Sequence, residues 1–423
     1  PVTPRFYGWP LVFVGFLLYG LGMAPAYYSW GFFAPEVIRE LGLSRQQIGE
    51  IFGAFTLGFA GVSSLTGALV SRFGLRATIT FGSFVAAAGW WWVSMAQSVT
   101  ELYLSYSLVG GVGIGLSTLL PAQTLPVYWF RKYRARATAV ILLGAAVFGA
   151  IVNPIDALIL EHYDWRTAWR IIAGTSIFVG LLALVFVRNK PEDVGQLPDG
   201  VDAEATPATV PSQRGADADG QALPLPARAQ WRPAQAIWTA QFVIITLAAM
   251  ANSVPWRVLT AHARLHFENL GFTPALAAAV LGVRVGMSGL GRLSGSFGDF
   301  LPPNRVLGLA LIVNGLGISG LIFATRPTLA YACVALLGVG YGAAFTSVPV
   351  VFANFFGREA FMATSGLRLA IVGVVGFIGP SWAGAAADRS GSYTSTLVVL
   401  AALCFCGSVA ISLCRAPEHP EQA

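Results

Sequence analysis

Charged residues are scarce in this sequence. Asp, Glu, Lys and Arg make up only 11% of its 423 residues, whereas 55% are hydrophobic. A soluble domain carries roughly 25% charged residues. The composition therefore argues against a soluble fold and indicates a protein whose apolar surface faces lipid.

Lysine and cysteine are also rare. Lys132 and Lys190 are the only lysines, so the net charge of +6 comes mainly from arginines in short loops between apolar runs. That distribution is typical of membrane topology, and no nucleic-acid partner is expected. Four cysteines without metal-ligand spacing are expected to pack as small buried hydrophobes. They are Cys333, Cys404, Cys406 and Cys414.

Catalytic signatures are missing as well. The glycine-rich stretch 110–115 does not follow a strand, so it indicates close helix packing rather than a nucleotide loop. There is no triad, metal cluster or phosphate loop in the sequence pattern. We therefore expect no enzyme, cofactor or metal site, and any transport must draw its energy from ion or solute gradients.

Long apolar runs are what the sequence has instead. A membrane-spanning helix needs about 20 apolar residues, and the first run is too long for a signal peptide. The pattern predicts an all-α membrane protein with twelve transmembrane helices. The runs are 7–33, 47–71, 76–97, 100–127, 136–161, 166–187, 235–266, 274–299, 304–324, 328–354, 361–386 and 393–414.

The segment 188–234 separates the sixth run from the seventh. It is rich in Pro, Gly, Ala and Asp and nearly free of aromatics, which predicts a disordered cytoplasmic linker. It divides the chain into an N-terminal six-helix bundle, 1–187, and a C-terminal six-helix bundle, 235–423. More than half of the 26 cationic residues fall on the linker side of the predicted helices, so both termini are expected in the cytoplasm. Arg264 is assigned to the opposite, outer side.

The two halves repeat each other. "ELGLS" at 40–44 corresponds to "NLGFT" at 269–273, and the basic stretch 128–138 corresponds to 354–364, in the same order along the chain. Two similar halves around a site near the membrane midplane are a recurrent transporter plan. The pattern therefore predicts two pseudo-symmetric six-helix bundles.

Several stretches now resemble a known family, the major facilitator superfamily, in its monocarboxylate-porter and oxalate–formate-antiporter branches. Ser71 departs from the family pattern, which usually has Asp there, and Gly149–Ala150 lacks the Gly-Pro pair of drug exporters. The resemblance implies a monomeric carrier in a bacterial inner membrane. The stretches are "FYGW" at 6–9, 127–152, "WRTAWR" at 165–170, 262–273, "GRLSGSFGD" at 291–299 and 352–367.

Charges inside the apolar runs are few, and most are arginines. A charge at the bilayer centre costs about 2.5–3.5 kcal/mol or more, so it usually faces a cavity. Acids at similar depth are limited to Asp156 and, near a helix end, Glu50. The surplus of positive charge predicts a bound anion, and a carboxylate fits the guanidinium fork. The arginines concerned are Arg257, Arg284, Arg292 and Arg368.

Arg284 and Arg292 are the main candidates for substrate contact. They lie about 12 Å apart along a helix, so they cannot both clamp one small carboxylate. The resemblance implies Arg292, which matches the family's helix-eight arginine, whereas Arg284 lies nearer mid-helix; either could instead brace neighbouring helices. Three polar side chains complete the predicted substrate site. They are Tyr28, Gln123 and Tyr341.

Two groups could couple transport to protons. The resemblance places a histidine at His262, whose ordinary pKa lies near physiological pH, and Asp156 is the deepest acid. Either could serve a proton symporter, while an anion exchanger needs neither. The sequence thus predicts a secondary active transporter of mono- or dicarboxylates. The alternatives are a non-transporting anion sensor and an exporter of drugs or lipophilic solutes.

Overall fold

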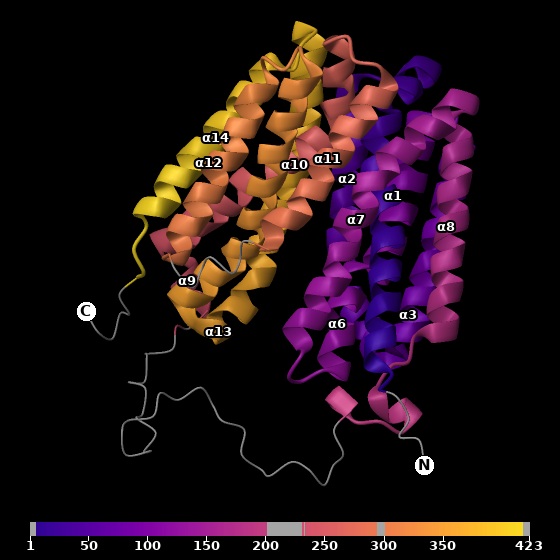
Figure 1. Cartoon of the computed structure of the whole chain (residues 1–423), viewed down its shortest axis with the longest axis vertical. Coiled ribbons are helices and arrows are strands. Elements are labelled where there is room, and N and C mark those ends of the chain that lie inside the picture. The colour runs from indigo at the N-terminus through magenta and orange to yellow at the C-terminus, as the bar shows by residue number, and fades with distance from the viewer. Residues whose placement is uncertain (1–5, 201–230, 232, 294–300, 418–423) are drawn as a thin grey trace.

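The computed structural model describes residues 6–200, 231, 233–293 and 301–417. Within these ranges every regular element is a helix. Figure 1 shows two helical bundles side by side, the first indigo to magenta and the second orange to yellow. The predicted all-α architecture of two bundles is confirmed.

The first bundle holds eight α-helices and one π-helix. Helix α1 ends where Gly42 takes a left-handed conformation (φ 67°), and α2 begins with a capping box between Ser44 and Gln47. The elements are α1 (Gly8–Leu41), α2 (Arg45–Gly61), α3 (Ser63–Val93), α4 (Val99–Leu102), the π-helix η1 (Tyr103–Gly110), α5 (Gly111–Ser117), α6 (Leu119–Trp129), α7 (Arg134–His162) and α8 (Trp165–Phe186).

The second bundle holds the remaining helices. They are α9 (Pro233–Ile237), α10 (Ala240–Asn269), α11 (Pro274–Leu293), α12 (Pro303–Leu321), α13 (Pro327–Ser390) and α14 (Thr394–Leu413). Ten helices in the described part of the chain are long and apolar enough to cross a membrane, and the bent pair of α2 and α3 counts as an eleventh.

Two glycines break long helices. Gly74 inside α3 has φ 84° and Gly357 inside α13 has φ 80°, a region that only glycine adopts without strain. The predicted runs 47–71 and 76–97 lie on either side of Gly74. Gly357 divides α13 into two limbs, which correspond to the predicted tenth and eleventh runs.

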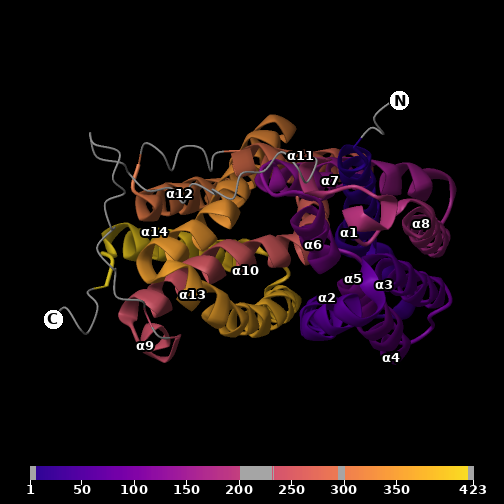
Figure 2. The ribbon, with the colours of Figure 1, turned by 90° about the horizontal axis from the view of Figure 1, so that it is seen from below.

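The bundles contact each other through glycine-lined helix pairs. A Cβ on Gly31 of α1 would collide with the Thr260 carbonyl of α10, and one on Gly282 of α11 would collide with the Ala150 carbonyl of α7. Small residues permit this close approach of backbones. The bundles meet near the turns that follow α1 and α13, here called the meeting end (Figures 1 and 2). Their ribbons diverge toward the opposite end, which carries the N-terminus and is here called the linker end.

The first residues of the predicted linker are folded. Two short 3-10 helices, Pro191–Val194 and Pro198–Gly200, pack against the linker end. Asp199 accepts hydrogen bonds from the N–H groups of Arg131 and Lys132 at 2.9 and 2.8 Å. The prediction of disorder is therefore wrong for 188–200, because these residues find partners on the first bundle. Residues 201–230 and 232, like 294–299 of the "GRLSGSFGD" motif, lie outside the described residues.

Candidate functional site

Five aromatic side chains gather where the two bundles face each other. They form a continuous chain of rings, here called the aromatic cluster. Its ring centroids are 5.2 Å apart for Tyr27 and Tyr28, 6.4 Å for Tyr28 and Trp256, 3.8 Å for Trp256 and Tyr341, and 6.0 Å for Tyr341 and Phe345. Helix α1 supplies the two N-terminal tyrosines, while α10 and α13 supply the others. The cluster thus spans both bundles.

Arg284 lies on this cluster and is almost fully buried. Its guanidinium carbon is 4.3 Å from the Trp256 ring centroid, a cation–π contact. Its Nη2 donates to the Thr260 hydroxyl at 3.0 Å and its Nη1 to the Trp256 carbonyl at 3.4 Å, while Nε has no hydrogen-bond partner in the described residues. All its acceptors are neutral, so its charge is not compensated locally.

Arg292 and Arg257 each reach from the second bundle to the first. Arg292 lies 5.1 Å above the Phe345 ring and donates to the Leu142 carbonyl of α7 at 3.2 Å. Arg257 donates to the Thr56 hydroxyl of α2 at 3.2 Å. Both are only partly buried. Both guanidinium groups therefore lie where the two bundles contact each other.

Tyr341 lies near all three of these arginines. Its hydroxyl lies within electrostatic reach of Arg257, Arg284 and Arg292, and Tyr28 is within reach of Arg284 and Arg292. Five of the predicted substrate residues thus belong to one neighbourhood.

Within the described residues, Arg257, Arg284 and Arg292, here called the cluster arginines, have no acidic partner. Among the described residues, ion pairs within 4 Å involve Arg166 and Arg264 and none of the arginines at this site. A buried charge is costly unless it is paired, so the site favours an added anion. A guanidinium binds a carboxylate through two parallel hydrogen bonds.

The other two predicted substrate residues, Arg368 and Gln123, have no described contact with the cluster. Arg368, on the second limb of α13, is buried, and its Nε has no hydrogen-bond partner in the described part of the chain. Gln123 on α6 is exposed, and no hydrogen bond between described residues joins it to the cluster. Their predicted contact with substrate stays a prediction.

The two predicted proton carriers lie in different surroundings. His262 on α10 is 1% exposed; its Nε2 is 2.8 Å from the Pro380 carbonyl and its Nδ1 is 3.2 Å from the Tyr393 hydroxyl. A neutral imidazole protonated on Nε2 satisfies both partners. Asp156 on α7 is 2% exposed and faces Ser29 of α1. Its Oδ2 has no hydrogen bond of normal geometry to any described residue.

Arg264 is more deeply buried than its predicted place on the outer side suggests. It lies in α10 with 1% exposure and binds Glu36 of α1 and Glu268. Arg264 lies within two turns of the end of α10, where a charged residue is usually exposed. Its burial could not be predicted because its partner Glu36 comes from the other bundle. Phe345 was not predicted as a site residue, because the sequence pattern does not distinguish it from the other apolar residues of its predicted helix.

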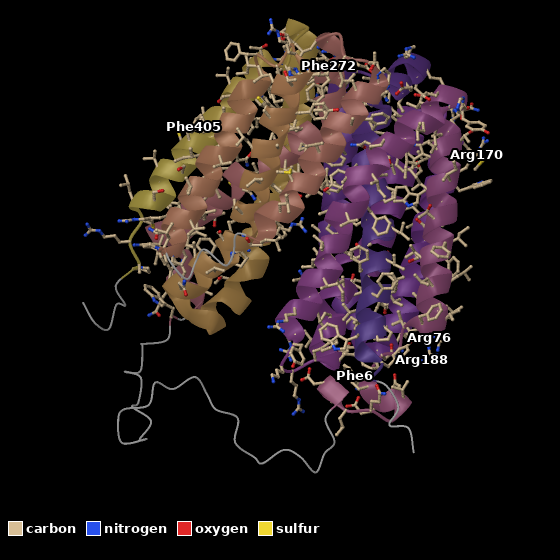
Figure 3. All side chains as sticks on the ribbon, viewed as in Figure 1. Phe6, Arg76, Arg170, Arg188, Phe272 and Phe405 are labelled. Carbon is tan, nitrogen blue, oxygen red and sulfur yellow. The ribbon has the colours of Figure 1, made fainter. Side chains whose placement is uncertain are left out.

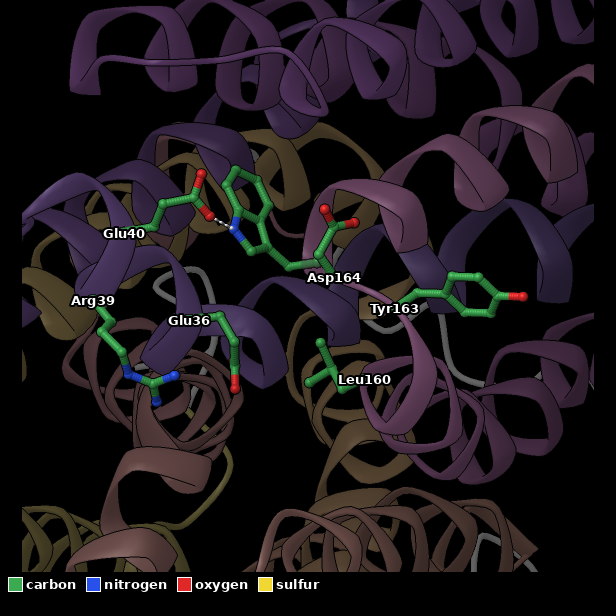
Figure 4. A pocket seen from close by; sticks show the side chains of 7 residues that line it. Glu36, Arg39, Glu40, Leu160, Tyr163 and Asp164 are labelled. Carbon is green, nitrogen blue, oxygen red and sulfur yellow. Dashed lines mark hydrogen bonds between the residues drawn. The ribbon is translucent and has the colours of Figure 1, made fainter.

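A separate pocket of about 380 Å³ lies at the meeting end, between α1, α7 and α8 (Figure 4). Glu40 accepts a hydrogen bond from the Trp165 indole there. Asp164 caps α8, and the hydrogen bonds from the Thr167 hydroxyl and N–H lower the pKa of its carboxyl. The pocket is built within the first bundle and is distinct from the aromatic cluster. Figure 3 shows side chains lining the ribbons of both bundles.

Comparisons with known proteins agree with this architecture. The family model described as Major Facilitator Superfamily matches residues 12–300. Monocarboxylate transporter 13 of Rattus norvegicus is 26% identical over 379 residues, covering 88% of this chain and 77% of the relative. Monocarboxylate transporter 3 of the same organism is 25% identical over 413 residues, covering 92% and 75%.

A solved structure shares the fold. It is a bacterial homolog to the human lysosomal transporter Spinster, in an inward-facing and unoccupied conformation. Its TM-score is 0.69 at 16% identity, and the match covers 96% of this chain and 94% of that chain.

Proposed function

Because the chain belongs to the Major Facilitator Superfamily, whose members are multi-pass membrane transporters and not enzymes, we propose that it carries small organic anions by alternating access. The substrates are mono- or dicarboxylates. The observation that carries the proposal is the set of cluster arginines, which have no carboxylate partner among the described residues and lie where the two bundles face each other. Two relatives are monocarboxylate transporters, which points to the same chemistry.

The geometry supports a division of roles among the arginines. Arg292 and Arg257 are partly exposed, so they can meet an anion that enters between the bundles. Arg284 is buried against the Trp256 ring, and its charge makes the electrostatic potential of the site positive. An anion at this point interacts with Arg257 and Arg292 of the second bundle. Both arginines also form hydrogen bonds to the first bundle, so the anion is linked to both. Binding therefore couples the bundles, as a rocking carrier requires.

The proposed orientation places the linker end in the cytoplasm of a bacterial cell, at the inner membrane. The coupling is proton symport or anion exchange. Export of lipophilic cations is the weaker alternative, because a site with uncompensated arginines repels them. A sensor would bind the same anion without moving it.

Uptake of labelled carboxylates into proteoliposomes tests the proposal. Arg292→Ala and Arg284→Ala should each be compared with wild type, and Arg389→Ala, which changes an exposed arginine of the meeting end, is the matched control. Losing a charge-assisted hydrogen bond costs about 1.5–3 kcal/mol, so at least one cluster variant should weaken binding by about tenfold or more. Normal flux in both would place the site elsewhere, and ligand stabilisation without flux would favour the sensor.

A further inference from the structure

We propose that the site selects carboxylates that carry a flat aromatic body, rather than short aliphatic acids. The inference rests on the proposed function and specifies its substrate class. It comes from the rings of the aromatic cluster and not from its charges, since the arginines would accept any carboxylate.

Three rings of the aromatic cluster are accessible. Phe345 is 44% exposed, and Tyr27 and Tyr341 are half-buried, whereas Tyr28 and Trp256 are buried behind them. In a membrane protein an exposed ring can simply face lipid, so the position of these rings relative to the arginines decides whether they can meet a ligand.

The accessible rings lie beside the arginines. Phe345 lies under Arg292, whose Nη1 reaches α7 of the other bundle, so its ring lies near the contact between the bundles. Tyr27 packs against Phe52 of α2 with 5.1 Å between centroids and lies within electrostatic reach of Arg257. Ring surface therefore flanks the two accessible arginines from both bundles.

The arginines and the rings are placed to bind the two ends of one aromatic acid. Arg292 and Arg257 can take the carboxylate of a ligand while its ring lies against Phe345, Tyr341 or Tyr27. Aromatic rings prefer offset-stacked or edge-to-face neighbours, and the cluster already shows both, with Trp256 stacked on Tyr341 at 12° and edge-on to Tyr28 at 81°. An aliphatic acid of two or three carbons would leave this surface uncovered.

The test uses the purified full chain, reconstituted and in detergent. Binding by calorimetry and competition against uptake are measured with benzoate, cyclohexanecarboxylate, lactate, succinate and the neutral benzamide. Benzoate should bind about tenfold or more tightly than lactate and succinate, because it buries a ring, and more tightly than the non-planar cyclohexane acid. Benzamide should bind far more weakly than benzoate, since it lacks the charge.

Variants then assign the preference to the rings. Phe345→Leu and Tyr341→Leu should each reduce the preference for benzoate over cyclohexanecarboxylate severalfold, and Tyr341→Phe, which keeps the ring, should retain it. Phe323→Leu, a residue 71% exposed and away from the cluster, is the matched control. Equal or tighter binding of lactate or succinate, or an unchanged preference in both leucine variants, overturns the inference while leaving anion transport standing. If no carboxylate binds, the proposed function itself fails.

Discussion

Arg264 of α10 and Glu36 of α1 form a two-pronged ion pair across the two bundles. Nη1 meets Oε2 at 2.9 Å and Nη2 meets Oε1 at 2.6 Å. Glu268 accepts from Nε at 3.1 Å, and the Phe32 carbonyl also accepts from Nη1. The N–H groups of the planar guanidinium therefore bind acceptors from both bundles.

This pair stabilises the arrangement in which the bundles meet at this end. A carrier that alternates must separate α1 from α10 here, and separation leaves Arg264 without Glu36. Breaking a buried pair by removing one partner costs about 3–5 kcal/mol. The ion pair therefore sets part of the barrier to opening at the meeting end.

Glu36→Gln should shift the population toward a form open at the meeting end. The physical reason is that the bundles lose a charged contact while the amide keeps the volume. Spin labels at Arg39→Cys and Thr394→Cys, in a background without native cysteines, would report the distance between the bundles. The longer-distance population should increase several-fold.

Glu40→Gln provides the control for this measurement. Glu40 pairs with Arg166 at 2.8 Å, but both residues belong to the first bundle. Its loss should leave the distance distribution unchanged. An unchanged distribution in Glu36→Gln as well would show that the Arg264 pair does not hold the bundles together.

Asp388 makes a second contact between the bundles. It binds backbone N–H groups at the N-terminus of α2 instead of a side chain. Its Oδ1 accepts from the Arg45 N–H at 3.1 Å and its Oδ2 from the Gln46 N–H at 3.0 Å, so a carboxylate of the second bundle caps α2 of the first. An anion at a helix N-terminus contributes about 0.3–1 kcal/mol. Asp388→Asn should therefore raise hydrogen exchange of the Arg45 and Gln46 amides by a few-fold and speed opening.

Asp164→Asn is the comparison for Asp388→Asn, because Asp164 caps α8 from within its own bundle. It should raise exchange at Thr167 and leave Arg45 and Gln46 protected. The lowered pKa of Asp164 adds a pH dependence: its capping contribution is present above the unfolded pKa of about 3.9 and is lost as pH falls through the lower folded value. Equal exchange at Arg45 in wild type and Asp388→Asn would argue against the cap across the bundles.

The sequence predicted the helices and the two bundles because apolar runs of spanning length leave few other folds. It predicted that Arg257, Arg284, Arg292, Tyr28 and Tyr341 share a site, because uncompensated charge is too costly to place elsewhere. The structure does bring these five together, while their contact with substrate stays a prediction.

What the sequence could not predict depends on partners far apart in the chain. The burial of Arg264 is set by Glu36 in another helix, and the folded start of the linker is set by contacts such as Asp199 with Arg131. The stack of Trp256 on Tyr341 joins residues from two helices whose relative rotation no hydrophobic pattern specifies. Local pattern gives the period of a helix but not which of its faces meets which neighbour.

The linker offers a test that separates a tether from a docking segment. Replacing 203–228 with a Gly-Ser sequence of equal length should leave transport near the wild-type rate, since such a chain still joins the bundles as a flexible coil. The folded residues 188–200 are kept, because Asp199 binds the loop before α7. Loss of flux in a protein that still binds the anion would instead assign a partner-binding role to this sequence.

Asp156 and His262 are the two buried groups considered for proton coupling. Asp156 of α7 faces Ser29 on α1 and is within electrostatic reach of Arg264. The charge of Arg264 is already neutralised by Glu36 and Glu268. Protonation of Asp156 would remove a negative charge from the neighbourhood of the ion pair that must break. His262, in contrast, has both ring nitrogens engaged as a neutral group. Asp156 is therefore the stronger of the two candidates for proton coupling, whose role stays a prediction.

If the protein is a proton symporter, uptake into liposomes should rise as the external pH falls from about 8 to about 5, because the proton enters with the anion. Asp156→Asn should lose this stimulation and keep exchange of internal for external anion, whereas His262→Gln should keep both. Loss of stimulation in His262→Gln alone would return the role to the histidine. Wild-type flux that ignores the pH gradient but responds to anion loaded on the far side would identify an exchanger, in which the Asp156 carboxyl stays in one protonation state throughout the cycle.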